Sequence, residues 1–219
     1  MTEPAKRGLF ISFEGPEGCG KTTQIRLLHE RLVGAAHRVL ITREPGGTAI
    51  GDEIRQLLQF SPAGRAMKPE TELLLFTASR AQLVREVIAP ALDSGVTVIA
   101  DRFLDSTTVY QGVARKIDNG AVALINGFAV SSLLPDITFI LDVDVDLSQK
   151  RVLGRPKAAG FPDRMEQQPR AFYERVRAGY LSLAASDARM RLVDASKPVA
   201  EVEARIWTHL HGFFDGNGL

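Results

Sequence analysis

The sequence contains little cysteine, no excess of charge of either sign and no long apolar run. Its single cysteine, Cys19, excludes a disulfide within the chain and a zinc site built from four cysteines. The 27 Lys and Arg residues nearly balance the 26 Asp and Glu residues, so no overall field draws the chain to nucleic acid or to a membrane surface. No stretch approaches the roughly 18 apolar residues of a transmembrane helix, and no signal-peptide core follows the charged N-terminus. We therefore expect a soluble, cytoplasmic protein with neither a nucleic acid nor a membrane as its partner.

The length and the order of apolar segments predict one α/β domain. A chain of 219 residues can bury one sizeable core and is short for two. Apolar runs at residues 8–14, 38–42, 96–100, 137–143 and 191–193 predict strands, and helical spacing predicts helices that include 50–60, 69–93 and 199–213. This alternation predicts a parallel sheet with helices on both faces and ligands outside the carboxyl ends of the strands.

A glycine-rich segment follows the first predicted strand directly. It reads Gly15-Pro16-Glu17-Gly18-Cys19-Gly20-Lys21-Thr22 and precedes a helical pattern that we expect to end at Gly34. In such loops the glycines let backbone N–H groups turn toward a phosphate chain, Lys21 supplies positive charge, and the Thr22 hydroxyl can bind Mg²⁺. We therefore predict an ATP-type triphosphate site at residues 15–22. The pattern leaves the phosphoryl acceptor open, because GTPases, motors and small-molecule kinases share it.

Two charged residues end the strand predicted at 96–100. Asp101 is placed to hold Mg²⁺ together with Thr22, and the neighbouring Arg102 matches a phosphate with two donors. The alternative for Asp101 is a simple turn or helix cap. The pair of a carboxylate and a guanidinium favours the site.

Other candidate residues have plain structural alternatives. Phe76 and Arg80 lie four residues apart on one predicted helix, so they can stack on and hydrogen-bond a nucleobase, or belong to the core. The loop Arg43-Glu44-Pro45-Gly46-Gly47-Thr48 can approach a ligand closely, or be a tight connection. The basic segment 151–166 can be a solvated loop, or an arginine-bearing lid that excludes water during phosphoryl transfer.

Taken together, these motifs resemble the thymidylate kinase family of the bacterial type, within the P-loop nucleoside monophosphate kinases. The resemblance covers residues 8 to 213. It is carried by Phe-Glu-Gly-Pro-Glu-Gly-Cys-Gly-Lys-Thr-Thr at 13–23, Arg-Glu-Pro-Gly-Gly-Thr at 43–48, Thr-Ala-Ser-Arg-Ala-Gln at 77–82, and Asp-Arg-Phe at 101–103 followed by Ser-Thr-Thr-Val-Tyr-Gln-Gly at 106–112. The combination is far more specific than any single motif.

The resemblance implies a fold and an activity. It implies the P-loop NTPase fold with a five-stranded parallel sheet, as a single domain over 1–219 with a short lid at about 151–164. It implies that the enzyme transfers the γ-phosphoryl group of ATP to dTMP, giving dTDP, with Mg²⁺ as cofactor and a homodimer as the common assembly.

The resemblance also implies roles for single residues. ATP phosphates would bind Gly15, Pro16, Glu17, Gly18, Cys19, Gly20, Lys21 and Thr22, and the metal would bind Thr22 and Asp101. Around dTMP, Glu17 would contact the 3′-hydroxyl or organise the metal's water, Phe76 would stack on thymine and Arg80 would hydrogen-bond it. Arg102 would hold the acceptor phosphate, and the remaining contacts would come from Pro45, Thr107, Tyr110 and Gln111. The residues expected to act in catalysis are Lys21, Arg102, Arg155 and Glu17.

One position separates members of the family. Some carry an arginine in the phosphate loop where this chain has Gly18, so here the lid must supply it. Arg155 is the first candidate and Arg151 the second, whereas Arg164 looks structural or adjacent to adenine. Alternatives for the whole chain are a P-loop kinase for another acceptor, such as dUMP or a nucleoside, a regulatory GTPase, or an inactive binding module. The sequence has no Asn-Lys-x-Asp run to read guanine, and the intact Lys21-Thr22-Thr23 argues against an inactive site.

Overall fold

A computed structural model of the chain describes residues 7–154 and 164–214, apart from the side chains of Arg65 and Glu166. Its centre is a five-stranded sheet in which every strand is parallel to its neighbours, in the order β2-β3-β1-β4-β5. The strands are β1 (Phe10–Glu14), β2 (Val39–Arg43), β3 (Thr97–Asp101), β4 (Ile137–Asp142) and β5 (Met190–Asp194). The predicted parallel sheet is therefore confirmed.

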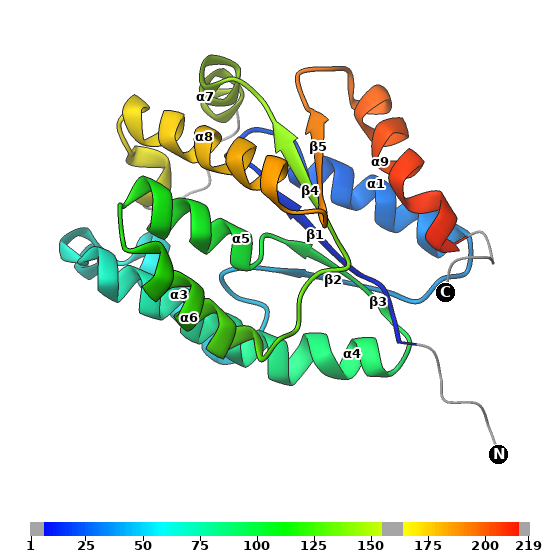
Figure 1. Cartoon of the computed structure of the whole chain (residues 1–219), viewed down its shortest axis with the longest axis horizontal. Helices are drawn as coiled ribbons and strands as arrows, with labels where there is room; N and C mark the ends of the chain where they lie inside the picture. Colours follow the sequence, from blue (N-terminus) through cyan, green and yellow to red (C-terminus); the bar gives the residue numbers. More distant parts are fainter. Residues whose placement is uncertain (1–6, 155–163, 215–219) are drawn as a thin grey trace.

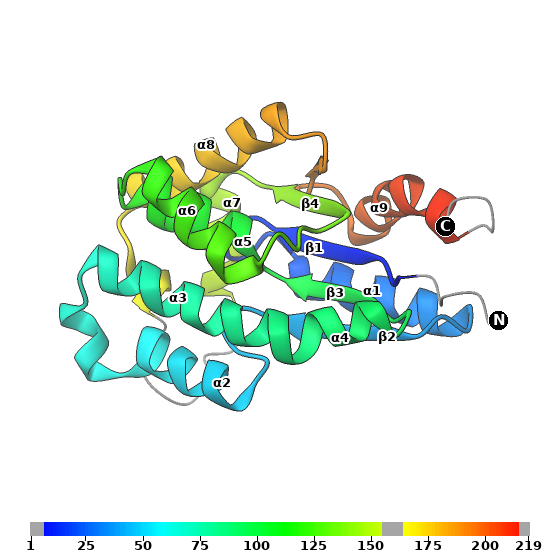
Figure 2. The same ribbon diagram turned by 60° about the horizontal axis from the view of Figure 1, so that its bottom comes forward.

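Helices cover both faces of this sheet (Figure 1). They are α1 (Lys21–Gly34), α2 (Ala49–Arg55), α3 (Pro69–Leu83), α4 (Ala89–Asp93), α5 (Leu104–Thr107), α6 (Asn119–Val130), α7 (Val145–Leu153), α8 (Arg170–Ser186) and α9 (Val199–Phe214). Figures 1 and 2 show α1 and α9 on one face, and α3 to α6 with α8 on the other. The phosphate-loop segment thus lies between the central strand and a helix of the first face.

Short irregular helices complete the chain. The π-helical segments Gln56–Phe60, Val84–Ile88 and Thr108–Ala114 continue α2, α3 and α5, and 3₁₀ segments span Pro62–Ala66 and Arg164–Gln167. The helix predicted over 69–93 is therefore continuous but contains a π segment. Pro90 explains why regular α-helix is lost there, because it has no N–H to donate to the carbonyl one turn earlier.

The core explains the long apolar runs of the sequence. Along β1, Ile11 and Phe13 pack in the cluster that contains side chains of α1 and α9, whereas Phe10 packs in the cluster of α3 and α4. Alternate residues of a strand point to opposite faces, so a strand covered on both faces carries apolar side chains in both directions. The strands of this sheet could be recognised from sequence for that reason.

One acidic side chain is buried away from the strand ends. Asp105 of α5 is 3% exposed, and its Oδ1 lies 3.5 Å from an Arg189 nitrogen just before β5. Burial, with repulsion from Glu14, raises the pKa of Asp105 from 3.8 to about 7, although Arg189 opposes the shift. The folded protein therefore holds this proton at pH values where the unfolded chain has lost it.

Asp105 should accordingly reduce stability as the pH rises. From about pH 4 to pH 7 the folded state binds the proton and the unfolded state does not. The contribution of Asp105 to the free energy of unfolding therefore decreases as the pH rises over this range. Relative to wild type, Asp105→Asn should gain about 2 to 4 kcal/mol between pH 4 and pH 8, at about 1.4 kcal/mol per pKa unit. Urea denaturation at the two pH values measures the gain.

A matched control is Asp194→Asn. Hydrogen bonds from Ser196 lower the pKa of Asp194, so its variant should lose stability relative to wild type as the pH rises. A pH-independent difference between wild type and Asp105→Asn would contradict the prediction.

Candidate functional site

The phosphate-loop segment folds as a turn between β1 and α1. Gly15 has a φ of 131°, and a Cβ there would lie 2.5 Å from the Leu141 carbonyl oxygen, so no larger residue fits. The Lys21 ammonium donates to the carbonyl oxygens of Gly15 and Pro16, at 3.0 and 3.1 Å. The loop thus curls around the amine at the N-terminal end of α1, where backbone N–H groups favour an anion.

Helix α7 is fastened to this loop. The Ser148 hydroxyl donates to the Glu17 carbonyl at 2.6 Å, and Arg151 donates to the carbonyls of Gly18 and Ala195, at 3.4 and 3.0 Å. At Gly18, whose φ is 77°, a Cβ would lie 2.6 Å from the Ser148 carbonyl oxygen. This packing is a physical reason why the loop carries glycine rather than arginine at this position.

Two oxygen-bearing side chains meet beside the loop. Thr22 Oγ1 donates to Asp101 Oδ2 at 3.4 Å, which joins the start of α1 to the end of β3. A hydroxyl and a carboxylate are the hard oxygen donors that Mg²⁺ prefers, with water and phosphate oxygens completing its shell. Within the described residues no group of three or more His, Cys, Asp or Glu side chains could hold a metal ion. The Thr22 and Asp101 oxygens fit a metal whose remaining ligands come from a nucleotide and water.

A cleft opens at the carboxyl ends of the strands and collects most of the predicted residues. Those that line it are Glu17, Gly18, Gly20, Lys21, Thr22, Pro45, Phe76, Asp101, Arg102, Thr107, Tyr110 and Gln111. Of the other described candidates, Gly15, Pro16, Cys19 and Arg80 are buried and do not line it. Arg43, Glu44, Ser106 and Met165, which the sequence analysis named only as members of longer segments, also line it, and the sequence reasoning missed Arg55 and Gln59 altogether.

Arg102 reaches into this cleft from an unusual backbone position. Its φ is 72°, in the left-handed region that non-glycine residues seldom adopt. One guanidinium nitrogen donates to Glu17 Oε1 at 2.6 Å, and Tyr110 donates to Glu17 Oε2 at 2.9 Å. Burial raises the pKa of Glu17, but Arg102 and Lys21 together hold it below its ordinary value. The charge of Glu17 is therefore compensated by two cations of the cleft, Arg102 and Lys21, and both cations can also bind phosphate.

The turn that presents Arg102 rests on a buried carboxylate. Glu14, fully buried at the end of β1, accepts hydrogen bonds from the backbone N–H groups of Phe103 and Ser106, at 2.8 and 3.1 Å. Its other oxygen accepts from the Ser106 and Tyr180 hydroxyls, at 2.6 and 2.8 Å. Glu14 therefore fixes the turn through four donors from β3's end, α5 and α8.

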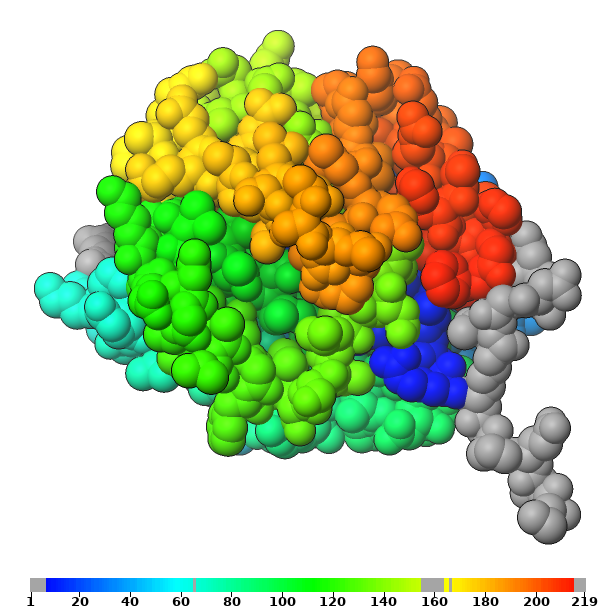
Figure 3. Space-filling model, viewed as in Figure 1, coloured from blue at the N-terminus to red at the C-terminus, as the bar shows by residue number. Residues whose placement is uncertain are grey.

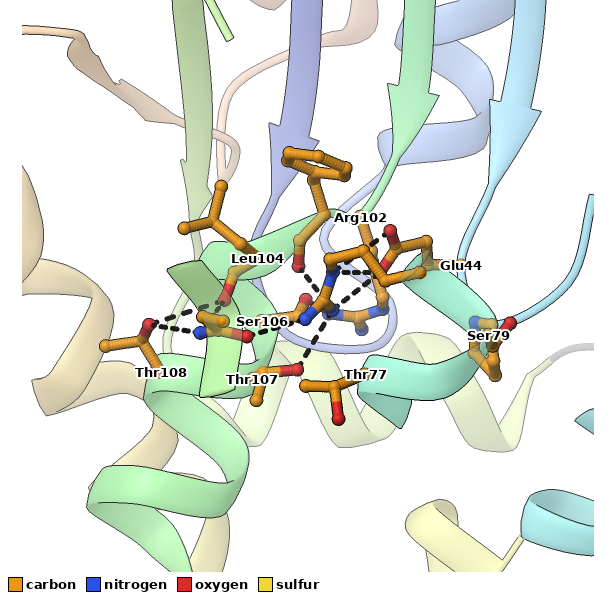
Figure 4. A network of polar contacts seen from close by, with 12 residues as sticks. Glu44, Thr77, Ser79, Arg102, Leu104, Ser106, Thr107 and Thr108 are labelled. Carbon is orange, nitrogen blue, oxygen red and sulfur yellow. Dashed lines mark hydrogen bonds and ion pairs between the residues drawn. The ribbon is translucent and has the colours of Figure 1, made fainter. Parts of the chain in front are cut away.

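Arg80 lies in a second buried network. It is 1% exposed, and its guanidinium donates to Glu44 at 2.6 Å, to Asn126 at 2.7 Å and to Thr107 at 2.9 Å. Figure 4 shows Glu44 and Thr107 pointing into this network from different elements. Burial raises the pKa of Glu44 to about 7, and Arg80 acts in the opposite direction. In this structure Arg80 ties the loop after β2 to α5 and α6, and its predicted contact with a base stays a prediction.

The three arginines considered for the lid differ in what the structure shows of their surroundings. Arg155 lies outside the described residues, and Arg151 binds the backbone of the phosphate loop. Arg164 donates to Glu72 at 2.5 Å and to the Leu58 carbonyl at 3.1 Å, so it holds a 3₁₀ segment against α3. This contact is of the structural kind, one of the two roles considered for Arg164, and the role beside adenine stays a prediction.

A second hollow lies on the outer side of the phosphate loop. It is bounded by Gly18 to Gly20, by Arg151 and by the segment from Ala195 to Val202. Gln24 of α1 points into its wall, donating from Nε2 to the Val199 carbonyl at 3.0 Å. Its Oε1 is buried and has no hydrogen-bond partner among the described residues. Gln24 Oε1 is therefore an unpaired hydrogen-bond acceptor close to the phosphate loop.

Several of these positions could not be read from their surroundings in sequence. Glu14 stands at the end of an apolar run, and Glu72 and Asn126 stand within helical apolar patterns; an acid or amide at such positions signals a buried polar contact but does not name its partner. Tyr180 carries no comparable signal.

Comparison with known proteins gives a consistent result. The family model described as thymidylate kinase matches residues 13–206. A thymidylate kinase of Deinococcus radiodurans is 46% identical over 202 residues, which cover 92% of this chain and 95% of that protein. That of Geotalea daltonii is 44% identical over 214 residues, which cover 96% of this chain and 100% of that protein. That of Thermomicrobium roseum is 47% identical over 199 residues, which cover 90% of this chain and 92% of that protein.

Proposed function

The chain belongs to the thymidylate kinase family, and from this premise we propose that it transfers the γ-phosphoryl group of ATP to dTMP, giving dTDP. The observation that carries the proposal is one cleft lined both by Lys21 of the phosphate loop and by Arg102 of the neighbouring strand. A phosphate donor and a phosphate acceptor would then meet between two cations. We propose that the whole chain acts as one kinase domain.

On the donor side, the residues of the loop fit the phosphates of ATP. The backbone N–H groups at the start of α1 and the Lys21 ammonium would bind them, and Thr22 and Asp101 would hold Mg²⁺. When bound, Mg²⁺ would neutralise charge on the transferred group. The adenine ring would enter the second hollow, beside Gly18 to Gly20 and Arg151.

On the acceptor side, Arg102 would hold the phosphate of dTMP and Glu17 would meet the 3′-hydroxyl. Phe76, half-buried at the cleft wall, would stack on thymine, and Tyr110 would crowd the position of a 2′-hydroxyl. The roles of Pro45, Thr107, Arg80 and Gln111 around the base are proposals from the family resemblance, and all but Arg80 line the cleft.

The chemistry asks for position and charge rather than for proton transfer. A phosphate-monoester oxygen is already largely ionised near neutral pH, since its second pKa is about 6. Holding the two phosphates in line and neutralising the charge between them therefore supplies the main rate enhancement. Arg155 is our proposal for the lid arginine, since Arg151 and Arg164 have other partners in the structure.

We also propose a homodimer of this chain. Helix α6 carries Leu124 and Phe128, which are 78% and 80% exposed, and α3 packs against it with Leu74 56% exposed. Figure 3 shows the α6 region, in green, uncovered on the face toward the viewer. Exposed apolar side chains gathered on one surface indicate an interaction site.

No helix among the described residues is long and apolar enough to cross a membrane, and we propose a cytoplasmic location.

The activity is tested by steady-state phosphorylation of a panel of acceptors with ATP. We expect dTMP to be used, dUMP to follow with a kcat/KM lower by roughly 10- to 200-fold because it lacks only a methyl group, and thymidine to be inactive. Chelation of Mg²⁺ with EDTA should abolish turnover. Phosphorylation of thymidine in preference to dTMP, or GTP hydrolysis with dTMP ignored, would contradict the proposal.

Arg102→Ala should separate the acceptor from the donor. Loss of the guanidinium should raise the KM for dTMP by at least about tenfold and lower kcat, with a smaller change in the KM for ATP, because phosphate contacts by arginine are charge-assisted. Lys21→Ala is the contrast and should lower kcat by about 10³, since its charge acts on the transferred group. Unchanged KM and kcat in Arg102→Ala would remove Arg102 from the site.

The dimer is tested on the exposed face of α6. The double variant Leu124→Glu, Phe128→Glu should be monomeric by sedimentation equilibrium at a concentration where wild type is a dimer, because carboxylates are costly to bury. The control Leu153→Glu alters an equally exposed apolar residue elsewhere and should leave the mass unchanged. A monomeric wild type would overturn the proposed dimer without touching the activity.

A further inference from the structure

One face of α3 carries three polar or aromatic side chains toward the cleft region. Glu72, Phe76 and Arg80 follow one another at intervals of four residues, so they share one side of the helix. Phe76 lines the cleft, and Arg80 belongs to the buried network described above. Glu72 has so far been described only as a partner of Arg164. It is 1% exposed, and an acid is costly to bury, so a role of this carboxylate in the cleft is worth testing.

Three residues donate four hydrogen bonds to the Glu72 carboxylate. Gln111 Nε2 and Arg115 Nε donate to Oε1, at 2.7 and 3.3 Å, and further nitrogens of Arg115 and Arg164 donate to Oε2, at 3.2 and 2.5 Å. Burial raises the pKa of Glu72, but the hydrogen bond from Gln111 and the charges of the two arginines bring it below its ordinary value. The carboxylate is therefore ionised at neutral pH.

An ionised carboxylate decides which way the Gln111 amide points. It can only accept hydrogen bonds, so the amide must turn its NH₂ group toward Glu72. Gln111 is 1% exposed yet lines the cleft, and among the hydrogen bonds of the described residues none ends on its Oε1. Gln111 Oε1 is thus the part of the amide that can accept a hydrogen bond from a ligand in the cleft.

We propose that Glu72 is a positioning residue that fixes the Gln111 amide with its oxygen available to the cleft, and that it thereby selects bases with a proton on N3. The inference rests on the proposed function, in which the cleft binds a pyrimidine nucleoside monophosphate. Thymine and uracil donate from N3, whereas cytosine presents a bare N3 acceptor that would face the amide oxygen. Two acceptors facing each other leave both unpaired, which costs binding. This selection is separate from recognition of the thymine methyl group.

Glu72→Gln should reverse the amide. The side chain of the variant can present its oxygen to Arg115 and Arg164, which only donate, and its NH₂ group to Gln111. Gln111 would then accept with Oε1 and turn its own NH₂ group toward the ligand. Cytosine N3 can accept from that group, and thymine N3–H cannot.

The experiment compares kcat/KM for dTMP, dUMP and dCMP in wild type and in Glu72→Gln. We expect the ratio of dTMP to dCMP to fall at least about tenfold in the variant, as hydrogen-bond complementarity is lost for one base and gained for the other. The ratio of dTMP to dUMP should stay within about twofold, because both bases carry N3–H. A general loosening of the cleft would instead change both ratios.

Arg115→Gln is the matched control. It removes one charge from the same carboxylate and leaves the contact between Glu72 and Gln111, so it should lower the melting temperature without changing the ratio of dTMP to dCMP. If Glu72→Gln does not fold, Glu72→Asp is the second variant: it keeps the charge, but its side chain is shorter by one methylene, so its contact with Gln111 is lengthened and the ratio should fall in the same direction.

The outcomes separate this inference from the proposed function. A wild-type enzyme that does not phosphorylate dTMP would end both. A wild type active on dTMP, with a folded Glu72→Gln or Glu72→Asp variant that keeps the wild-type ratio of dTMP to dCMP, would overturn the role of Glu72 alone.

Discussion

The carboxylate of Glu14 is the contact on which the geometry of the cleft depends. It lies at the end of the central strand, fully buried, and receives two backbone N–H groups and two hydroxyls. A buried donor left without its acceptor costs about 1 to 3 kcal/mol, so four donors on one side chain strongly favour a single arrangement. That arrangement includes the left-handed backbone at Arg102. The loop for the donor phosphates starts at the next residue, Gly15, so one carboxylate sets both halves of the site.

Arg80 and Arg102 show how burial divides similar residues between tasks. Arg80 is 1% exposed, and a carboxylate, an amide and a hydroxyl surround it, so its charge is compensated within the fold. Arg102 has a side chain 16% exposed and shares its carboxylate partner, Glu17, with Lys21 and Tyr110. A charge with a shared and partly exposed partner can exchange it for a phosphate at small cost. A fully enclosed charge cannot, because leaving its partner alone in the interior is expensive.

The sequence was informative where the physics is local. Strands covered on both faces carry apolar side chains in both directions, so five short apolar runs were enough to predict the sheet, and the phosphate loop is one continuous motif with a fixed spacing. Thr107 and Gln111 could be placed at the cleft only through the family resemblance, whereas helical spacing left Phe76 with a base-stacking role or a place in the core. The partners of Glu14, Glu72 and Arg80 could not be predicted, because each joins residues that are separated by tens of positions and meet only in the folded chain. The position of α7 against the phosphate loop belongs to the same class.

The contact between the phosphate loop and α7 limits how this enzyme could be redesigned. With the carbonyl oxygen of Ser148 only 2.6 Å from where a Cβ of residue 18 would be, the loop and the helix form one packed unit. Introducing an arginine at residue 18 would require the backbone of α7 to be rebuilt at the same time. Such an exchange would have to move the whole segment from β4 onward as a cassette, because a point substitution cannot accommodate the new side chain.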